Sequence, residues 1–278
     1  MVEESDVRRA AWDQVADAWA RNRDFMWDTT RQVGEWLVDR VDPKPGDVIV
    51  DLAGGPGENG FLAARRLKTS GKVIVTDFAP GMVAVARRRA DELGLGNVET
   101  RVLDATEMDL EGDSVDGIIC RWGLMLMPDP GAALGECRRV LKDGGRLALS
   151  VWGDPERNPW VTVTGRTLDR LGFPPARDPF GPGGMFSLSD PGSLQSMVKA
   201  AGFTEVEVEE MEIDWRFDSF DHFWTYQTEV SSSMSAFVRE LESSEVERFR
   251  LALEANVKPF HKDSGLLLAG MTLNVSAS

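Results

Sequence analysis

The run Val48-Ile-Val-Asp-Leu-Ala-Gly-Gly-Pro-Gly57 constrains the fold of this chain more than any other segment. It indicates an apolar strand that ends in an acid and leads into a glycine-rich turn, where backbone amides can approach a ligand because no Cβ is in the way. A second apolar run ends in Asp77, twenty residues after Gly57. An acid in that place can accept hydrogen bonds from the hydroxyls of an adenosine ribose. The pattern therefore indicates a site for a nucleoside cofactor.

Strands and helices alternate through the chain at the spacing of a parallel sheet. The predicted strands cover residues 48–52, 73–76, 98–103, 117–120, 146–152, 204–214 and 266–275. The predicted helices between them cover residues 61–67, 82–93, 129–141 and 190–202. A further helix is expected near residues 161–171.

Two segments lie outside this alternation, and the first of them, residues 153–189, is rich in proline and glycine. Residues 219–262 are expected to form two or three inserted helices, with a capping box at Ser244 and Glu247. An apolar stripe marks the last of them: Val246, Phe249, Leu253, Val257 and Phe260. Near the N-terminus, Trp12, Val15, Ala16 and Trp19 share one face of an amphipathic helix.

Charge and composition exclude several classes of function. The net charge is −15, with 46 acids against 31 bases, so the chain lacks the basic footprint of a nucleic-acid binder. Cys120 and Cys137 are too few for a disulfide framework and fit a reducing compartment. The acidic N-terminus lacks the features of a signal peptide, and no apolar run is long enough for a membrane span. We therefore expect a cytoplasmic protein. His222 and His261 make no recognisable metal site.

The glycine turn leaves more than one cofactor open. Gly55-Pro-Gly-Glu-Asn-Gly60 matches the dinucleotide fingerprint G-x-G-x-x-G, which is a weak signal alone. A charged Asp51 would oppose a pyrophosphate, whereas it could hold an ammonium group. No second mononucleotide half follows. A nicotinamide-dependent oxidoreductase is therefore an alternative, and a non-catalytic cofactor-binding protein of the same fold is another.

From Val48 to Trp152 the chain resembles the class I S-adenosylmethionine-dependent methyltransferases. Asp51-Leu-Ala-Gly-Gly-Pro-Gly57 is similar to the family's D-x-G-x-G-x-G, with Ala53 in place of the first glycine. Asp77-Phe78, Leu103-Asp-Ala105 and a run similar to R-V-L-K-P-G-G-x-L, Arg138-Arg-Val-Leu-Lys-Asp-Gly-Gly-Arg-Leu147, follow in the family's order. The ubiquinone/menaquinone-biosynthesis methyltransferases and their small-molecule relatives look most similar. Their Arg-Asn pair is missing from residues 123–129, which argues against quinone biosynthesis.

The resemblance implies an α/β, Rossmann-like fold: a seven-stranded, mostly parallel sheet with helices on both faces, an antiparallel last strand and a helical cap insertion. It implies a helical lid at residues 1–45, a cofactor domain at 46–218 and 263–278, and a substrate cap at 219–262. S-adenosylmethionine would be the cofactor and S-adenosylhomocysteine the product. The acceptor would be small and apolar or aromatic, methylated by in-line displacement that depends on alignment. The protein would be a monomer or homodimer.

The resemblance also implies site residues. Asp51 would face the methionine ammonium group, Asp77 the ribose and Phe78 the adenine. Asp104 and the Ala105 amide would hold the adenine edge. The full set expected to bind the cofactor is Trp19, Asp51, Ala53, Gly54, Gly55, Gly57, Asp77, Phe78, Met82, Asp104, Ala105, Arg121 and Trp122.

Simpler roles stay open for several of these residues. Asp51 and Asp77 could cap neighbouring helices, and Asp104 could belong to a local turn. Trp19 is equally a lid residue or a staple that fixes the first helix. The Arg121 backbone is expected at the ammonium group, and Trp122 either faces the methyl group or the substrate, or packs in the core. No catalytic residue is identified; Trp122 and His222 are weak candidates, and His222 is more simply a partly exposed helix residue.

Overall fold

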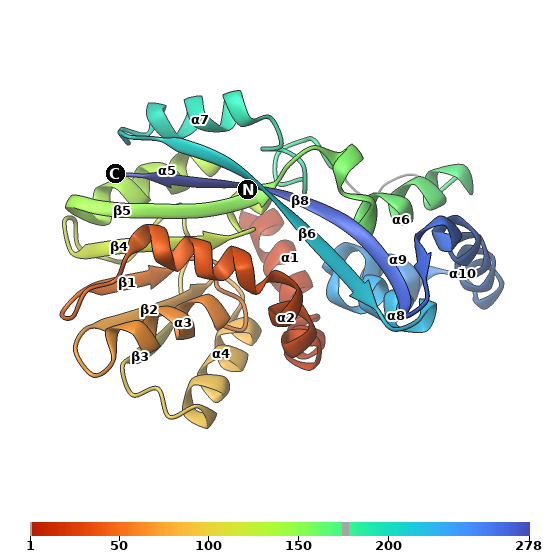
Figure 1. Cartoon of the computed structure of the whole chain (residues 1–278), viewed down its shortest axis with the longest axis horizontal. Helices are drawn as coiled ribbons and strands as arrows, with labels where there is room; N and C mark the ends of the chain where they lie inside the picture. Colours follow the sequence, from red (N-terminus) through yellow and green to blue (C-terminus); the bar gives the residue numbers. More distant parts are fainter. Residues whose placement is uncertain (1, 174–177) are drawn as a thin grey trace.

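A twisted mixed sheet forms the centre of the computed structural model, which describes residues 2–173 and 178–278 (Figure 1). The strand order is β3-β2-β1-β4-β5-β8-β6, with the short β7 paired to β8. The strands from β1 to β5 pair in parallel, and β8 runs antiparallel to both β5 and β6. This confirms the predicted seven-stranded, mostly parallel sheet with its antiparallel last strand. The strands are β1 (Val48–Asp51), β2 (Lys72–Asp77), β3 (Val98–Val102), β4 (Val115–Arg121), β5 (Leu141–Trp152), β6 (Glu207–Phe217), β7 (His261–Lys262) and β8 (Gly265–Ala277).

The helices cover the sheet and extend it at one end. Those next to the sheet are α2 (Ala16–Val41), α3 (Glu58–Leu67), α4 (Pro80–Glu92), α5 (Pro130–Val140) and α7 (Pro191–Ala200). At one end gather α6 (Pro159–Arg170), α8 (Phe220–Val230), α9 (Ser232–Glu240) and α10 (Ser243–Val257), where β6 and β8 project beyond the other strands (Figure 1). Apolar side chains from both groups join one continuous core. Within the described ranges, no helix has the length and apolarity required to cross a bilayer.

The N-terminal segment forms two helices where the sequence pattern suggests one. The first, α1 (Val2–Asp13), ends three residues before α2 begins. The break follows from a tertiary contact: the Asp13 carboxylate accepts the Gly81 amide at 2.6 Å, which docks the end of α1 on the first turn of α4. The rings of Trp12 and Trp19 still meet edge to face, with centroids 5.8 Å apart.

The inserted segment forms three helices, α8, α9 and α10, as the sequence analysis allows. The capping box of α10 lies two residues earlier than predicted, since Glu242 and Glu245, not Ser244 and Glu247, exchange the capping hydrogen bonds. Both pairs have the required spacing, and the earlier one adds residues to the helix. The buried face matches the predicted stripe at Phe249, Leu253 and Val257.

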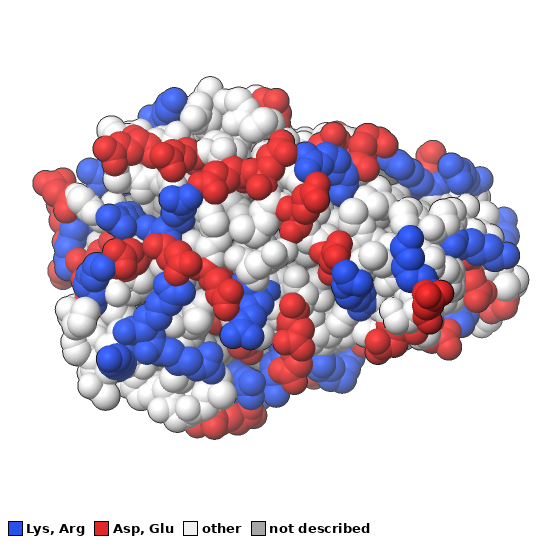
Figure 2. All heavy atoms as spheres, in the orientation of Figure 1, with Lys and Arg blue, Asp and Glu red and all other residues white. Residues whose placement is uncertain are grey.

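The edge strand β6 begins and ends three residues later than predicted and is strongly acidic. Its last residues alternate in burial, because Ile213, Trp215 and Phe217 point into the core while their neighbours face solvent. Carboxylates on its exposed side pair with an arginine of another element, since Glu210 and Glu212 both pair with Arg157. Acidic and basic side chains are interleaved over this face of the molecule (Figure 2). Such charges discourage a second chain from pairing with an open sheet edge.

Candidate active site

The glycine turn after β1 is held by backbone hydrogen bonds to both neighbouring strands. The Leu52 amide donates to Ile119 on β4 at 2.8 Å, and the Gly54 amide donates to Thr76 on β2 at 2.8 Å. Gly57 then serves as the N-cap of α3, with φ of 93°. The turn therefore lies at the carboxyl ends of three parallel strands, where open α/β sheets bind their ligands.

Asp51 lies directly beneath this turn and is fully buried. Its Oδ2 accepts the Gly60 amide at 2.8 Å, and its Oδ1 has no hydrogen-bond partner among the described residues. A Cβ on Gly54 would lie 2.8 Å from the carboxylate, so the chain approaches it closely. Burial raises the pKa of Asp51 to about 7, although the Gly60 amide and the Arg121 charge oppose this shift. The carboxylate both anchors α3 and keeps one oxygen for another donor.

Asp77 braces the turn from the end of β2. Its Oδ2 accepts the Gly55 amide and its Oδ1 accepts the Ala79 amide, each at 3.0 Å. Burial raises the pKa of Asp77 to about 6, and the two backbone amides act in the opposite direction. Each oxygen retains a second lone pair, so these contacts are compatible with the predicted ribose contact, which stays a prediction.

Ala53, which replaces the family's first glycine, adopts the left-handed backbone conformation with φ of 51°. The turn survives the replacement because Gly123 leaves room for the extra methyl group: a Cβ on Gly123 would lie 2.6 Å from the Ala53 Cβ. An alanine in this conformation is strained relative to glycine.

Ala53→Gly is therefore expected to stabilise the fold by about 0.5–1 kcal/mol, the relief of strain outweighing the greater flexibility of the unfolded chain. Urea unfolding would measure it. Ala84→Gly is the control, because Ala84 is exposed in the middle of α4 and the same change there should cost about 1 kcal/mol. A destabilised Ala53→Gly variant would show that the methyl contact matters more than the strain.

The N-terminal helices cover the turn. The Trp19 ring lies against it, since a Cβ on Gly55 would be 3.8 Å from Trp19 Cε3. Met82 is buried in a small cluster with Val15 and Ala16, and Phe78 packs at the edge of the same cluster. Trp19, Phe78 and Met82 are thus brought together beside the turn, and their contact with a cofactor stays a prediction.

The Asp104–Ala105 pair lies after β3, where Asp104 is exposed and Ala105 is buried. Asp104 Oδ1 accepts both the amide and the hydroxyl of Thr106, at 2.9 and 2.7 Å. This is the local turn that the sequence analysis gives as the simpler role. A contact with adenine stays a prediction for this pair.

Arg121 and Trp122 follow β4 in an unusual conformation. Trp122 has φ of 56°, which is rare for an aromatic residue and is found mostly where a site constrains the backbone. Its indole donates to Thr272 Oγ1 at 3.1 Å, and the Trp152 ring stacks on it at 4.1 Å. The Arg121 guanidinium lies over the same ring, 5.1 Å from its centroid. These contacts are those of packing, so a role for Trp122 beside the methyl group stays a prediction.

His222 and His261 lie away from the glycine turn. His222 lies near the start of α8, its ring 4.6 Å from that of Phe25 and its Nδ1 3.6 Å from Asp218 Oδ2. A chain of ring contacts through Trp152, Trp215 and Phe217 separates it from Trp122. His261 is exposed on β7. Neither position supports general-base catalysis at the glycine turn.

Several residues at the site belong to no sequence motif that would predict their role. Thr30 accepts a hydrogen bond from Arg121 although 91 residues separate them. The Val230 carbonyl accepts the Trp19 indole at 2.9 Å, and Ala79 supplies an amide to Asp77. Only Gly60 had a signal, as the last glycine of the G-x-G-x-x-G match. The contacts of Thr30 and Val230 arise from packing between distant segments, and the Ala79 amide belongs to a local turn after β2.

The site fits S-adenosylmethionine. Buried polar atoms are nearly always hydrogen-bonded, and the unpartnered Asp51 Oδ1 is an acceptor that a ligand ammonium group would satisfy. The left-handed Gly55, with φ of 54°, keeps the backbone open for close approach. Asp51, the glycine turn and Asp77 would hold the cofactor, whose sulfonium supplies the activated methyl group.

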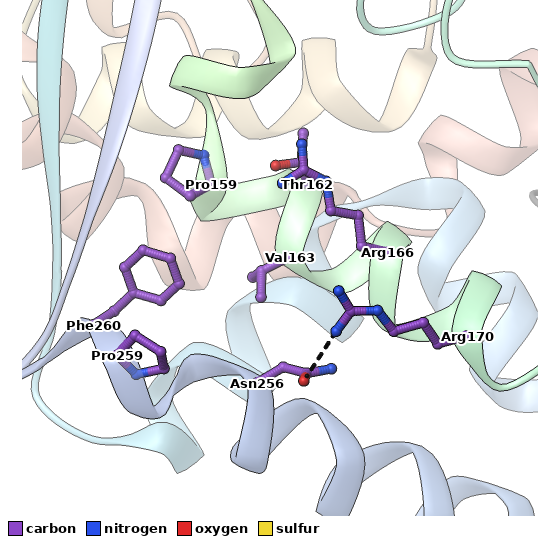
Figure 3. A pocket seen from close by; sticks show the side chains of 8 residues that line it. All are labelled: Pro159, Thr162, Val163, Arg166, Arg170, Asn256, Pro259 and Phe260. Atoms are coloured by element: carbon purple, nitrogen blue, oxygen red, sulfur yellow. Dashed lines mark hydrogen bonds between the residues drawn. The ribbon is translucent and has the colours of Figure 1, made fainter.

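Two surface hollows lie elsewhere. One, of about 210 Å³, is formed by α6 with the end of α10 and the short turn Lys258–Phe260; Arg170 and Asn256 meet across it (Figure 3). The other, of about 720 Å³, is an open groove between α2 and β6, with Phe25 and Glu212 among its walls. Neither includes a residue of the glycine turn, so neither is the cofactor site.

Comparisons with known proteins agree with this geometry. The family described as "Methyltransferase domain" matches residues 43–158. Nocamycin O-methyltransferase of Saccharothrix syringae is 30% identical over 207 residues, 70% of this chain and 74% of that protein. Demethylmenaquinone methyltransferase of Clavibacter sepedonicus is 33% identical over 147 residues, 52% of this chain and 58% of that protein. The chain spans only about half the length of several other curated relatives.

The fold has solved counterparts. The crystal structure of the YcgJ protein from Bacillus subtilis superposes with a TM-score of 0.60 at 18% identity, covering 89% of this chain and 97% of that chain. At this identity the likeness concerns the fold alone.

Proposed function

This chain belongs to the S-adenosylmethionine-dependent methyltransferase family, and from that premise we propose that it methylates a small acceptor with an apolar or aromatic body. The observation that carries the proposal is Asp51, a buried carboxylate with an unpartnered oxygen beneath the glycine turn. An acid there suits the ammonium group of a methionine moiety and repels the pyrophosphate of a dinucleotide. The cofactor is S-adenosylmethionine.

The proposed reaction needs little from the protein beyond position. A sulfonium methyl group is already a strong electrophile, so catalysis consists of aligning the acceptor with it and excluding water. The absence of a histidine from the described surroundings of the turn is compatible with this scheme. The methylated atom, whether O, N, C or S, is left open.

Residues 1–45 and 219–262 are proposed to cover the reaction as lid and cap. Three hydrogen bonds between them support this role: Trp19 to the Val230 carbonyl, Arg21 to Glu229, and Arg239 to Gln14. These contacts join the two segments to each other. Nearby aromatic rings, such as those of Trp152 and Tyr226, favour an apolar acceptor. We also propose a reducing, cytoplasmic location, because Cys120 and Cys137 are buried free thiols.

Calorimetric titration with S-adenosylhomocysteine, with NADH in parallel, tests the proposal. We expect a dissociation constant of about 1–100 μM for the former and no binding of the latter. The reverse result would make the turn a dinucleotide site. Methyl transfer to a panel of small aromatic acceptors is the second step. Binding without any transfer across the panel would favour a non-catalytic protein of the same fold.

A further inference from the structure

A row of buried polar side chains crosses the sheet beneath α2. Arg121 on β4 is the register partner of Ser150 on β5, and Ser150 is the partner of Asn274 on β8. Register partners on neighbouring strands point to the same face of a sheet. The hydrogen bond from Arg121 to Thr30 identifies this face as the one that α2 covers. We call Arg121, Ser150 and Asn274 the polar row.

The Arg121 cation lacks a close counter-charge. Its one hydrogen bond to another side chain in the described part of the chain is to the Thr30 hydroxyl. Asp51 and Glu58 act on it only as charges at a distance, and each has other partners, the Gly60 amide and Arg89 respectively. Burial lowers the pKa of Arg121, which reflects the cost of keeping this charge away from water. A buried cation without a paired anion is unfavourable, and an anionic ligand would offset that cost.

The neighbours of Arg121 in the row are also poorly satisfied. Ser150 is fully buried, and its hydroxyl has no hydrogen-bond partner in residues 2–173 and 178–278. Asn274 is fully buried too, and its amide nitrogen has only the Met211 sulfur, at 3.7 Å. A guanidinium, a hydroxyl and an amide side by side are all donors, so together they suit a group with two acceptor oxygens. Glu209 continues the row on β6, but it already pairs with Arg40 and the Trp36 indole.

The position of the row relates it to the acceptor. β4 lies next to β1, so Arg121 is one strand away from Asp51 and the glycine turn. On the other side lies Tyr226 of the cap helix α8, near enough for the Arg121 charge to act on its hydroxyl. Arg121 therefore stands between the proposed cofactor position and the proposed cap, which is where an acceptor must lie to receive a methyl group.

We propose that Arg121 binds a carboxylate group of the methyl acceptor, with Ser150 and Asn274 as additional donors, and so restricts the enzyme to acidic acceptors. This rests on the function proposed above. Arginine suits the task because its planar fork matches the two oxygens of a carboxylate. The apolar body of the acceptor would then extend along the neighbouring tryptophans, beginning with Trp122 and Trp152.

The test uses the full-length protein saturated with S-adenosylhomocysteine. Benzoate, 2-naphthoate and anthracene-2-carboxylate are titrated against their neutral carboxamides by calorimetry. We expect at least one carboxylate to bind about tenfold more tightly than its amide. Arg121→Gln should abolish this preference. The titrations are made at about pH 8.5, where Asp51 is charged, and the cofactor is expected to contact only the backbone of Arg121, so S-adenosylhomocysteine affinity should stay within about twofold of wild type. Arg166→Gln, on an arginine half-exposed on α6, is the matched control and should keep the preference.

Ser150→Ala is a second variant, which tests the inference even if Arg121→Gln does not fold. It is expected to fold normally, because the hydroxyl that it removes makes no hydrogen bond with the described residues. It should weaken carboxylate binding by about threefold. No preference for any carboxylate, or a preference that survives in Arg121→Gln, would overturn the inference. A tenfold loss of S-adenosylhomocysteine affinity in Arg121→Gln would instead assign the arginine to the cofactor's own carboxylate. Failure of the wild type to bind S-adenosylhomocysteine would refute the proposed function itself.

Discussion

Gly55→Val is expected to weaken S-adenosylhomocysteine binding by roughly 100-fold or more, an effect of about 3 kcal/mol. Gly55 lies at the centre of the turn with φ of 54°, and its amide is held by Asp77 at 3.0 Å. A branched side chain would fill the space in which the ligand is proposed to contact the backbone of the turn. It would also push on the Trp19 ring, which lies 3.8 Å from the site of the new Cβ.

The same substitution elsewhere separates binding from backbone strain. Gly94 has a similar φ of 63°, is exposed and has nothing within 4 Å of an added Cβ. Gly94→Val should therefore lose about 1–2 kcal/mol of stability, as Gly55→Val does, but bind the ligand normally. Calorimetry on both variants, with urea unfolding alongside, makes the comparison. Normal binding by Gly55→Val would show that the turn does not touch the ligand.

Asp51→Asn should abolish a pH dependence that the wild type shows in ligand binding. Burial raises the pKa of Asp51 to about 7, so the carboxylate becomes charged only near neutral pH. The ligand ammonium group needs that charge, and wild-type affinity for S-adenosylhomocysteine should fall by up to about tenfold per pH unit below 7. The variant should bind weakly and with little change between pH 5.5 and 8.

The free protein should show the opposite trend in stability. Because the folded-state pKa of Asp51 lies above the ordinary value of 3.8 that applies in the unfolded chain, the native state binds the proton more tightly than the unfolded state. Its contribution to stability is therefore present in acid and is lost as pH rises from about 4 to 7. Between pH 5 and pH 8, Asp51→Asn should gain about 2 kcal/mol relative to wild type. Asp77, with a pKa raised to about 6, adds a smaller effect of the same sign to both proteins.

Urea unfolding of the unliganded proteins at several pH values measures this difference. The control is Asp28→Asn, on an acid exposed on α2, whose stability should follow the wild type. If the free energies of unfolding of wild type and Asp51→Asn changed in parallel with pH, Asp51 would be ionised over the whole pH range measured. The candidate ammonium site would then lack its expected signature.

Local sequence patterns account for the frame of the site. The apolar run of β1, the glycines after it and the acid that ends β2 each follow from interactions among residues close together in the chain. The stripe at Phe249, Leu253 and Val257 likewise predicts a buried helix face, because helical periodicity is a property of a short segment. Where a local pattern had two equivalent solutions, as in the capping box of α10, the sequence alone did not distinguish them.

The tertiary structure decided which groups meet. The break before α2 depends on the contact of Asp13 with Gly81, and the buried Arg121 depends on Thr30, residues 68 and 91 positions apart. The same holds for Trp122, whose stacking partner Trp152 belongs to the next strand of the sheet. The sequence by itself thus determined the family, the order of strands and helices, and the turn that is proposed to hold the cofactor. The burial of Asp51 and the unpaired charge of Arg121 were decided only by packing, because burial and pairing depend on every segment that surrounds a side chain.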